Sequence, residues 1–294
     1  MKQTTLAKRV EGVGIGLHKG EPIQITLEPL EANSGVLFYR RDVGLLVQAL
    51  PHNVVNTQMA TVIGNANYYI STIEHLLSAI YAYGIDNVRV VLDGAEVPVM
   101  DGSSASFCMM LDEAGIRTLD ATKQVLIIKK EVEVHDGKKF AKVSPSLKPT
   151  YSFIIDFDHP SIGKQEYHFE FSKKSFIEEI SRARTFGFLR DVQMLRSKGL
   201  ALGGSLDNAV VMDDKKILNP EGLRFSNEFV RHKILDAIGD LSLLGAPFVG
   251  DYASYAGSHN LNHELTKEIL KDPSNYEIRT LSQESAQEFQ KVFA

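Results

Sequence analysis

The distribution of apolar residues predicts an α-helix over residues 226–244. Apolar side chains recur every three or four positions there, which places them on one side of a helix: Val230, Ile234, Ile238 and Leu241. Ser226 is a favourable N-cap, and Gly245 followed by Pro247 suits the end of the helix. The pattern therefore indicates a helix with one face in the core.

Other helices follow from the same spacing. Residues 71–83 repeat apolar side chains at helical intervals and stop at Gly84, and Ser71 with Glu74 fits a capping box. Further helices are predicted at residues 107–115, 175–182, 191–197 and 264–270, the last of them capped by Asn262. β-Branched and alternating runs predict strands between them: residues 23–27, 36–39, 88–92, 125–128, 132–134, 140–143, 151–157 and 167–171.

The order of these elements predicts an α+β protein of two domains. Near residues 119–123 the pattern changes from helix back to strands, so we place an N-terminal α+β domain at 1–121 and a C-terminal one at 122–294. The second half repeats the order of the first, strands and then helices, without detectable sequence repetition. A duplication would therefore be visible only in the fold.

Composition excludes several classes of protein. With 44% hydrophobic and 23% charged residues, the 294-residue chain is neither disordered nor fibrous. A net charge of −5 gives no global attraction to nucleic acid or to an anionic membrane. The single cysteine, Cys108, cannot form an intrachain disulfide, the N-terminus lacks the apolar core of a signal peptide, and no apolar run is long enough to span a membrane. We expect a cytoplasmic protein with no nucleic-acid partner.

Candidate chemistry lies on the second face of the helix at 226–244. His232, Asp236 and Asp240 follow one another at four-residue spacing and share that face. Two ligands four residues apart can bind one metal ion, but a solvated charged face shows the same spacing. With 37 acidic residues and nine histidines, about one such pair arises by chance. Spacing alone leaves both interpretations open.

The remaining polar candidates are equally open when taken singly. Glu74 suits a helix cap, His75 suits a polar position at the edge of the core, and His259 suits either a turn or a titrating acid. The apolar, glycine-punctuated residues 186–211 could pack on their own domain or line a groove for an alkyl chain. Residues 12–20 are rich in glycine but precede a strand, so they do not form a dinucleotide loop, and an oxidoreductase is excluded.

Together, and in this order, these signals resemble a known family, the zinc-dependent UDP-3-O-acyl-N-acetylglucosamine deacetylases of Gram-negative bacteria, which catalyse the committed step of lipid A synthesis. Eight stretches carry the resemblance almost from end to end: GVGIGLHKG (12–20), STIEHLLSA (71–79), GIDNV (84–88), EVPVMDGSS (96–104), SRARTFGFLRD (181–191), LGGSLDNAVV (202–211), LRFSNEFVRHKILDAIGDL (223–241) and SHNLN (258–262). The resemblance implies two similar domains, each a β-sheet layered against two helices, with the active site at their interface.

The resemblance also implies a metal site and its chemistry. The zinc ligands would be His75, His232 and Asp236, with one Zn²⁺ per chain; Fe²⁺ would fit the same ligands. Glu74 would be the general base for the attacking water, and it could not fully serve as base and as helix cap at once. His259 would be the acid that protonates the departing amine. Three further roles follow from matched positions: Asp240 would orient His259, Thr185 would stabilise the oxyanion, and Lys233 would contact the diphosphate.

The substrate implied is a UDP-linked acylated amino sugar, whose uracil would contact Phe157. Residues 186–211 would form the passage for its 3-O-acyl chain, a reversal of the simple packing interpretation. The passage residues occupy matched positions: Phe186, Leu189, Val192, Ala201, Gly204 and Val211. The small side chains at 201 and 204 suggest a wide passage. A monomer is expected.

Two positions limit the resemblance. Ser258 replaces the glycine that usually precedes the histidine at position 259, which puts the geometry of that loop in doubt. His18 belongs to a matching stretch but receives no mechanistic role. The alternatives are a zinc amidohydrolase that acts on another acylated sugar, and a metal-free binding protein of the same fold. All candidate ligands and acid–base residues are present, which favours the enzyme.

Overall fold

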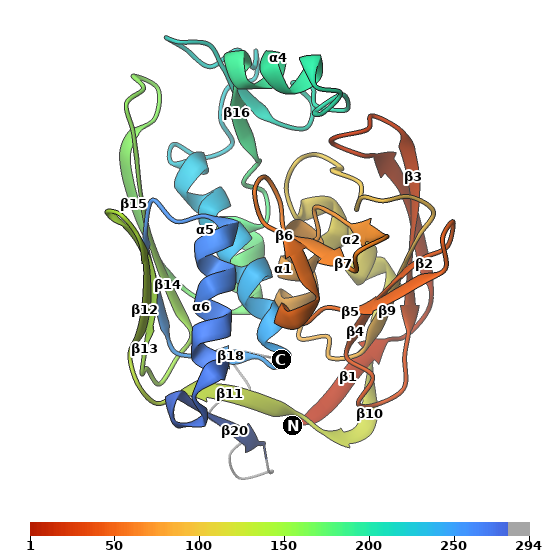
Figure 1. Cartoon of the computed structure of the whole chain (residues 1–294). Helices are drawn as coiled ribbons and strands as arrows, with labels where there is room; N and C mark the ends of the chain where they lie inside the picture. Colours follow the sequence, from red (N-terminus) through yellow and green to blue (C-terminus); the bar gives the residue numbers. More distant parts are fainter. Residues whose placement is uncertain (282–294) are drawn as a thin grey trace.

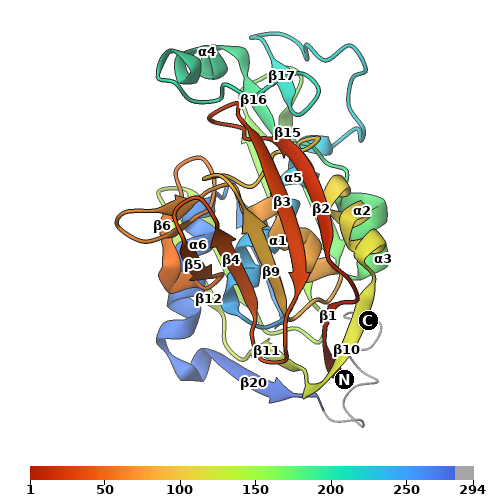
Figure 2. The same cartoon turned by 90° about the vertical axis from the view of Figure 1, so that its right-hand side faces the viewer.

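The computed structural model, which describes residues 1–281, contains two five-stranded sheets of identical topology (Figures 1 and 2). In each sheet one central pair of strands is parallel and the other neighbours are antiparallel. The first sheet has the order β2 (Val10–Ile15), β3 (Pro22–Pro29), β9 (Val88–Leu92), β4 (Val36–Arg40) and β5 (Leu45–Gln48). The second has the order β12 (Val132–Asp136), β13 (Lys139–Ser144), β19 (Asp251–Tyr255), β14 (Thr150–Phe157) and β15 (Gly163–Glu170). The repetition that the sequence hides is therefore present in the fold.

Four helices fill the space between the two sheets (Figure 1). Two belong to the first half, α1 (Glu74–Ala82) and α2 (Ala105–Ala114), and α2 contacts β2. Two belong to the second half, α5 (Glu228–Leu241) and α6 (His259–Lys271), and they contact the second sheet. The predicted α+β fold of two sheet-and-helix halves is confirmed.

Short strands complete the two halves. Each small sheet pairs either strands that are distant in the sequence or strands that follow one another along the chain. They are β1 (Lys2–Leu6) with β10 (Ile116–Thr122); β11 (Gln124–Ile128) with β18 (Phe248–Val249) and β20 (Tyr276–Thr280); β6 (Val54–Asn56), β7 (Val62–Gly64) and β8 (Tyr69–Ile70); and β16 (Phe186–Phe188) with β17 (Val210–Met212). The chain passes from β10 to β11 near the boundary predicted at residue 121, and that boundary remains a prediction.

Residues 186–211 form an excursion from the second half, which carries α4 (Leu189–Ser197) and stands apart from the two large sheets (Figure 1). Its return segment is tied to the first half, because the N–H groups of Leu202 and Gly203 donate to the carbonyl oxygens of His18 and Leu17. The excursion therefore bridges the two halves at one end of the molecule. Among residues 1–281, no helix combines the length and the apolar character needed to cross a bilayer.

Several predicted helix ends are wrong. The N-cap of α5 is Asn227 instead of Ser226, and α6 begins at His259 instead of 264. Its N-cap is Ser258, whose hydroxyl accepts a hydrogen bond from the Leu261 N–H, so Asn262 lies inside the helix. The predicted helix at 175–182 is a short α-turn followed by one π-helical turn over Phe176–Ile180. Gly245 does end the α5 region, with φ +82°.

The two halves meet where α1 crosses α5. Gly239 of α5 lies directly against the backbone of Glu74, and a Cβ atom at position 239 would overlap the Glu74 carbonyl oxygen. Since both backbones are in regular helices, neither can move aside without a cost in free energy. The absence of a side chain at Gly239 thus allows the close approach that brings the two helices, and the polar residues on them, together.

Gly239→Ala is expected to lower the free energy of unfolding by about 1–3 kcal/mol, the usual cost of overpacking a core. The sign is diagnostic, because glycine to alanine inside a helix otherwise stabilises by about 1 kcal/mol. Thermal or urea unfolding of the purified variant measures the change. A raised melting temperature would contradict the close contact between α1 and α5.

Candidate active site

Two histidines and one aspartate converge where α1 and α5 cross. His75 comes from the first turn of α1, and His232 and Asp236 lie one turn apart on α5. The Asp236 Oδ1 atom lies 3.3 Å from the His232 Nε2 atom and 3.5 Å from the His75 Nε2 atom. One potential ligand atom from each residue lies within 4.8 Å of the others, and all three side chains are buried. This spacing matches a site for one metal ion.

The charges of these groups suit metal binding, which requires neutral imidazoles and an ionised carboxylate. Burial lowers the pKa of His232 to about 4, despite the opposing charge of Asp236. Burial also opposes ionisation of Asp236, yet the neighbouring His232 and Lys233 hold its pKa well below the usual value. The ligand forms of the histidine and the aspartate are therefore present near neutral pH.

Hydrogen bonds leave the inward-facing atoms of the cluster available. The His232 Nδ1 atom lies 3.0 Å from the Ala183 carbonyl oxygen, which orients the ring and turns Nε2 toward the cluster. Asp236 Oδ2 accepts from Lys233 Nζ at 2.7 Å, whereas Oδ1 is buried and has no hydrogen-bond partner within residues 1–281. A buried, unpaired carboxylate oxygen between two imidazole nitrogens is explained if a metal ion occupies the space between them.

The segment that supplies Ala183 is held by a buried ion pair. Arg184 Nε donates to Glu228 Oε1 at 2.8 Å, and the Arg184 N–H donates to the same oxygen at 2.9 Å. Both side chains are almost completely buried. This pair anchors Arg184 beside the first turn of α5, one residue after Ala183 and one before Thr185. The Thr185 N–H donates to the Gly102 carbonyl at 2.8 Å.

Glu74 is the first residue of α1, and its side chain does not cap the helix. The N-cap is Ile73, which makes no side-chain cap hydrogen bond, so the predicted capping box is wrong. Glu74 Oε2 accepts the N–H of Thr61 at 3.1 Å, and Oε1 lies 3.7 Å from the Nε2 atom of His259. Burial raises the pKa of the Glu74 carboxyl group, against the opposing charge of His259. The carboxylate is therefore free for chemistry and more basic than usual.

His259 is held by Asp240 at the other side of this space. The His259 Nδ1 atom lies 2.8 Å from the Asp240 Oδ2 atom, and Asn262 Nδ2 donates to the same oxygen at 2.8 Å. Burial opposes protonation, but the charges of Asp240 and Glu74 outweigh it and raise the pKa of His259 to about 9. Protonated His259 therefore presents Nε2–H toward Glu74 at neutral pH.

The doubt about Ser258 has a structural answer. Ser258 adopts φ −145° and ψ 168°, an extended conformation open to any residue, so no glycine is needed there. Its hydroxyl group caps α6 at the residue immediately before His259. The serine thus helps to place His259 at the start of a helix.

One aromatic residue of the excursion, Phe186, lies near the cluster. The Phe186 ring centroid lies 6.3 Å from that of His232 and 5.8 Å from that of Phe157. Phe157 ends β14, and both phenylalanine rings are partly exposed. Phe186 thus lies near His232, and Phe157 packs edge-to-face against Phe186. Lys233 follows His232 on α5; burial lowers its pKa, but the charge of Asp236 outweighs burial and the net change is an increase.

The other residues predicted for the acyl passage lie farther out along the excursion. Leu189 and Val192 belong to α4, where both are half-buried, and Val211 is a buried residue of β17. Ala201 is buried, and Gly204 lies within contact range of its carbonyl oxygen. These residues share one substructure, and their proposed contact with a substrate remains a prediction.

Sequence reasoning missed Thr61 and Ala183 and misread Asn262. Thr61 touches both Glu74 and Asp240, Ala183 orients His232, and Asn262 binds Asp240. Thr61 lies in a connecting segment with no motif of its own, and Ala183 lies in the matching stretch 181–191, where its contact is made by a main-chain oxygen that no residue type signals. Asn262 was interpreted as a cap, although its position one turn after Ser258 could have placed it on the same helix face as His259.

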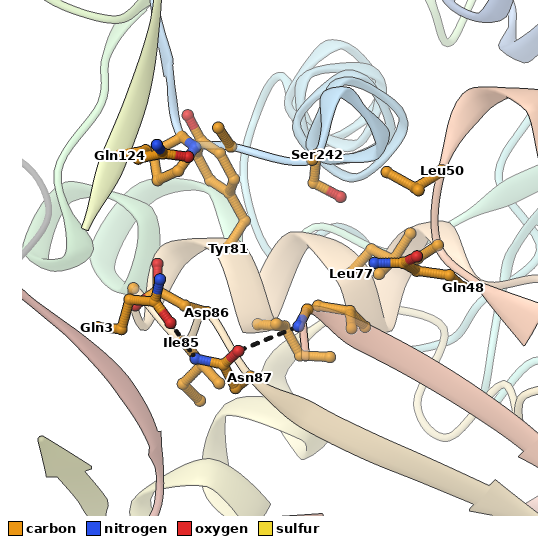
Figure 3. Close-up of a pocket in the computed structure, with 18 of the residues that line it drawn as sticks. Gln3, Gln48, Leu50, Leu77, Tyr81, Ile85, Asp86, Asn87, Gln124 and Ser242 are labelled. Carbon is orange, nitrogen blue, oxygen red and sulfur yellow. Dashed lines mark hydrogen bonds between the residues drawn. The ribbon is translucent and has the colours of Figure 1, made fainter. Parts of the chain in front are cut away.

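A separate hollow of about 290 Å³ lies at the other ends of α1 and α5 (Figure 3). Leu77 and Tyr81 line it from α1, and Ser242 lines it from the segment after α5. Its polar groups already bind one another, since Asn87 Nδ2 donates to Gln3 Oε1 at 2.9 Å. Neither the histidine cluster nor Glu74 borders this hollow, so the candidate active site lies elsewhere.

Comparison with known proteins agrees with this site. The family model described as UDP-3-O-acyl N-acetylglycosamine deacetylase matches residues 3–271. Proteins named UDP-3-O-acyl-N-acetylglucosamine deacetylase are similar over 100% of both chains: those of Campylobacter fetus subsp. fetus (68% identity), Campylobacter lari (66%) and Campylobacter hominis (65%). The chain therefore belongs to the UDP-3-O-acyl N-acetylglycosamine deacetylase family.

Proposed function

We propose that this protein hydrolyses the N-acetyl group of a UDP-3-O-acyl-N-acetylglucosamine and releases acetate and the free glucosamine amine, the committed step of lipid A biosynthesis. One observation carries the proposal. The possible metal ligands His75, His232 and Asp236 lie at the same helix crossing as Glu74, whose pKa is raised, and His259, which is protonated at neutral pH. The names of the full-length relatives supply the substrate class. A UDP-linked substrate also supports a cytoplasmic location, because nucleotide sugars are made in the cytoplasm.

His75, His232 and Asp236 would hold one Zn²⁺ ion, and the same donors would accept Fe²⁺. When bound, the metal ion supplies Lewis-acid chemistry, polarising the acetyl carbonyl and lowering the pKa of water. Three protein ligands on two helices leave a coordination position open, as catalytic zinc sites do.

Glu74 would act as the general base. Its carboxylate is buried and has a raised pKa, so it can accept a proton from the attacking water as the oxygen bonds to the acetyl carbon. The Thr185 hydroxyl group would then donate to the oxyanion that develops on the carbonyl oxygen. Both residues are held by hydrogen bonds, since Glu74 accepts the Thr61 N–H and the Thr185 N–H donates to the Gly102 carbonyl oxygen.

His259 would act as the general acid. As the C–N bond of the tetrahedral intermediate breaks, its Nε2–H proton passes to the departing amine, and acetate is left behind. Asp240 keeps the imidazole protonated and oriented through Nδ1. His259 Nε2 and Glu74 Oε1 lie 3.7 Å apart, so the proposed acid and base could both reach the same bound acetamido group.

The wider site would select the substrate. Lys233 would bind the diphosphate and Phe157 the uracil; Lys233 is paired with the candidate ligand Asp236, and Phe157 packs against Phe186, which lies near His232. The excursion at residues 186–211 would receive the acyl chain. We further propose that residues 1–121 and 122–294 are the two domains, that the active site lies at their interface, and that the protein is a monomer.

The test combines metal analysis with an assay of acetate release from the UDP-linked acylated sugar. Chelator-treated protein is expected to lose activity, and one equivalent of Zn²⁺ per chain is expected to restore it; Fe²⁺ added without oxygen is compared in parallel. A substrate analogue without the 3-O-acyl chain should react more slowly. Zinc binding without acetate release would show that the substrate is wrong, and failure to bind any metal would refute the cluster as a metal site.

A further inference from the structure

We propose that Thr61 is a positioning residue that fixes the general base and the histidine–aspartate pair relative to each other. This inference rests on the proposed function of Glu74, Asp240 and His259. Thr61 lies immediately before β7, in a connection that carries no recognisable motif, and it is 2% exposed. From there it contacts both carboxylates of the acid–base machinery.

The main-chain atoms of Thr61 bind the start of α1. Its N–H donates to Glu74 Oε2 at 3.1 Å, and its carbonyl oxygen accepts the N–H of Ile73 at 3.4 Å. These two bonds hold the Thr61 backbone beside the first turn of the helix. One carboxylate oxygen of Glu74 is thereby occupied, and the other, Oε1, is turned toward His259.

The side chain of Thr61 binds the second half of the chain. Its hydroxyl group donates to Asp240 Oδ1 at 2.5 Å, across 179 positions of sequence. The other oxygen, Oδ2, is taken by His259 Nδ1 and Asn262 Nδ2, each at 2.8 Å. Within residues 1–281, the Thr61 hydroxyl group is therefore the one hydrogen-bond donor to Asp240 Oδ1.

This division of contacts orients the carboxylate plane of Asp240. A buried carboxylate with one oxygen unpaired would turn or shift to recover a donor, because an unsatisfied buried acceptor is unfavourable. Such a turn would move Oδ2 and with it the His259 ring. The hydrogen bond from the Thr61 hydroxyl prevents this rotation of the Asp240 carboxylate. The hydrogen bond from the Thr61 N–H fixes the position of the Glu74 carboxylate at the same time.

The hydroxyl contribution can be removed without changing the backbone. Thr61→Val keeps the shape of the side chain and the two main-chain bonds, and Thr61→Ser keeps the hydroxyl but loses the methyl group. Thr61→Val is expected to lower kcat about ten- to hundredfold, the range for losing a hydrogen bond to a charged group. KM and the metal content should stay at wild-type values, because within residues 1–281 Thr61 makes no hydrogen bond to the candidate ligands. Thr61→Ser should recover kcat to within about threefold.

A spectroscopic readout separates positioning from a general structural role. The proton on His259 Nδ1, bound to Asp240, has its own NMR resonance, which a His259→Gln variant assigns. This resonance should move in Thr61→Val and return in Thr61→Ser, in both metal-free and zinc-loaded protein. If wild-type protein releases no acetate, the proposed reaction fails, but the resonance still tests the contact between Thr61 and Asp240.

Thr26→Val is the matched control, since Thr26 is a buried threonine of β3 outside the site, and it should retain kcat and the resonance. If Thr61→Val does not fold, Thr61→Ala replaces it. Wild-type kcat together with an unmoved resonance in the hydroxyl-free variant would overturn the inference. Equal losses in the serine and valine variants would overturn it as well, because they would assign the effect to the methyl group.

Discussion

His232→Ala is expected to abolish both stoichiometric metal binding and acetate release. The variant removes one of three ligands, leaving His75 on one helix and Asp236 on the other. Losing a partner outside the ligand shell already weakens metal affinity by about 10–100-fold, and losing a ligand itself should exceed that range. Because Ala183 O would also lose its imidazole partner, the segment that carries Thr185 should loosen.

Metal analysis after dialysis, together with a zinc titration monitored by calorimetry, measures this loss. The matched control is His135→Ala, which removes an exposed histidine of β12 paired with Glu133. It should keep wild-type zinc affinity and activity. If His232→Ala retained one tightly bound zinc ion, His232 would not be a ligand, and the grouping of His75, His232 and Asp236 would need another explanation.

How far the sequence could predict this site is clearest for α5. Periodicity predicted the helix and its core face, and Gly245 marked its end. The start was misassigned because Ser226 and Asn227 are both good cap residues, and local chemistry does not choose between them. The same ambiguity, with Ser258 and Asn262, placed the start of α6 five residues too late.

The metal cluster shows a different limit. The spacing of His232 and Asp236 was visible, but a solvated face would share it, and His75 looked like a polar residue near the core. The three meet because Gly239 lets α1 approach α5, a tertiary contact that no local pattern encodes. The resemblance to a family united these residues before the structure did, and their roles as ligands remain a prediction.

Contacts between distant segments were not predictable at all. Thr61 and Asp240 are 179 positions apart, and neither lies in a pattern that points to the other. For Glu74 the local rule was misleading, since a glutamate three residues after a serine fits a capping box, yet the helix begins at Glu74 itself. Local propensity gave way there to a tertiary bond with the Thr61 N–H.

Glu74→Gln is expected to lower kcat by about two to four orders of magnitude while one metal ion per chain is retained. The amide oxygen of glutamine can still accept the Thr61 N–H, so the geometry of the site should persist. What is lost is the ability to take a proton from water. Metal content and acetate release measured on the same sample separate these effects, and near-normal turnover would remove Glu74 from the mechanism.

The pH profile of kcat/KM tests the same assignment through its shape. Glu74 must be ionised, so activity should rise as pH increases through its pKa, which burial raises above the usual value for a glutamate. His259 must be protonated, so activity should fall as pH increases through its pKa of about 9. A bound cation favours ionised Glu74 and neutral His259, and it moves both limbs to lower pH. The wild-type profile should therefore be bell-shaped.

The variant should remove one limb of the profile and keep the other at a shifted position. In Glu74→Gln the residual activity should lose the ascending limb that belongs to Glu74, while the descending limb of His259 persists. The descending limb should also shift to lower pH, because the negative charge of Glu74 contributes to the raised pKa of His259. A flat wild-type profile from about pH 5 to 9, or an ascending limb unchanged in the variant, would show that the base and acid are other groups.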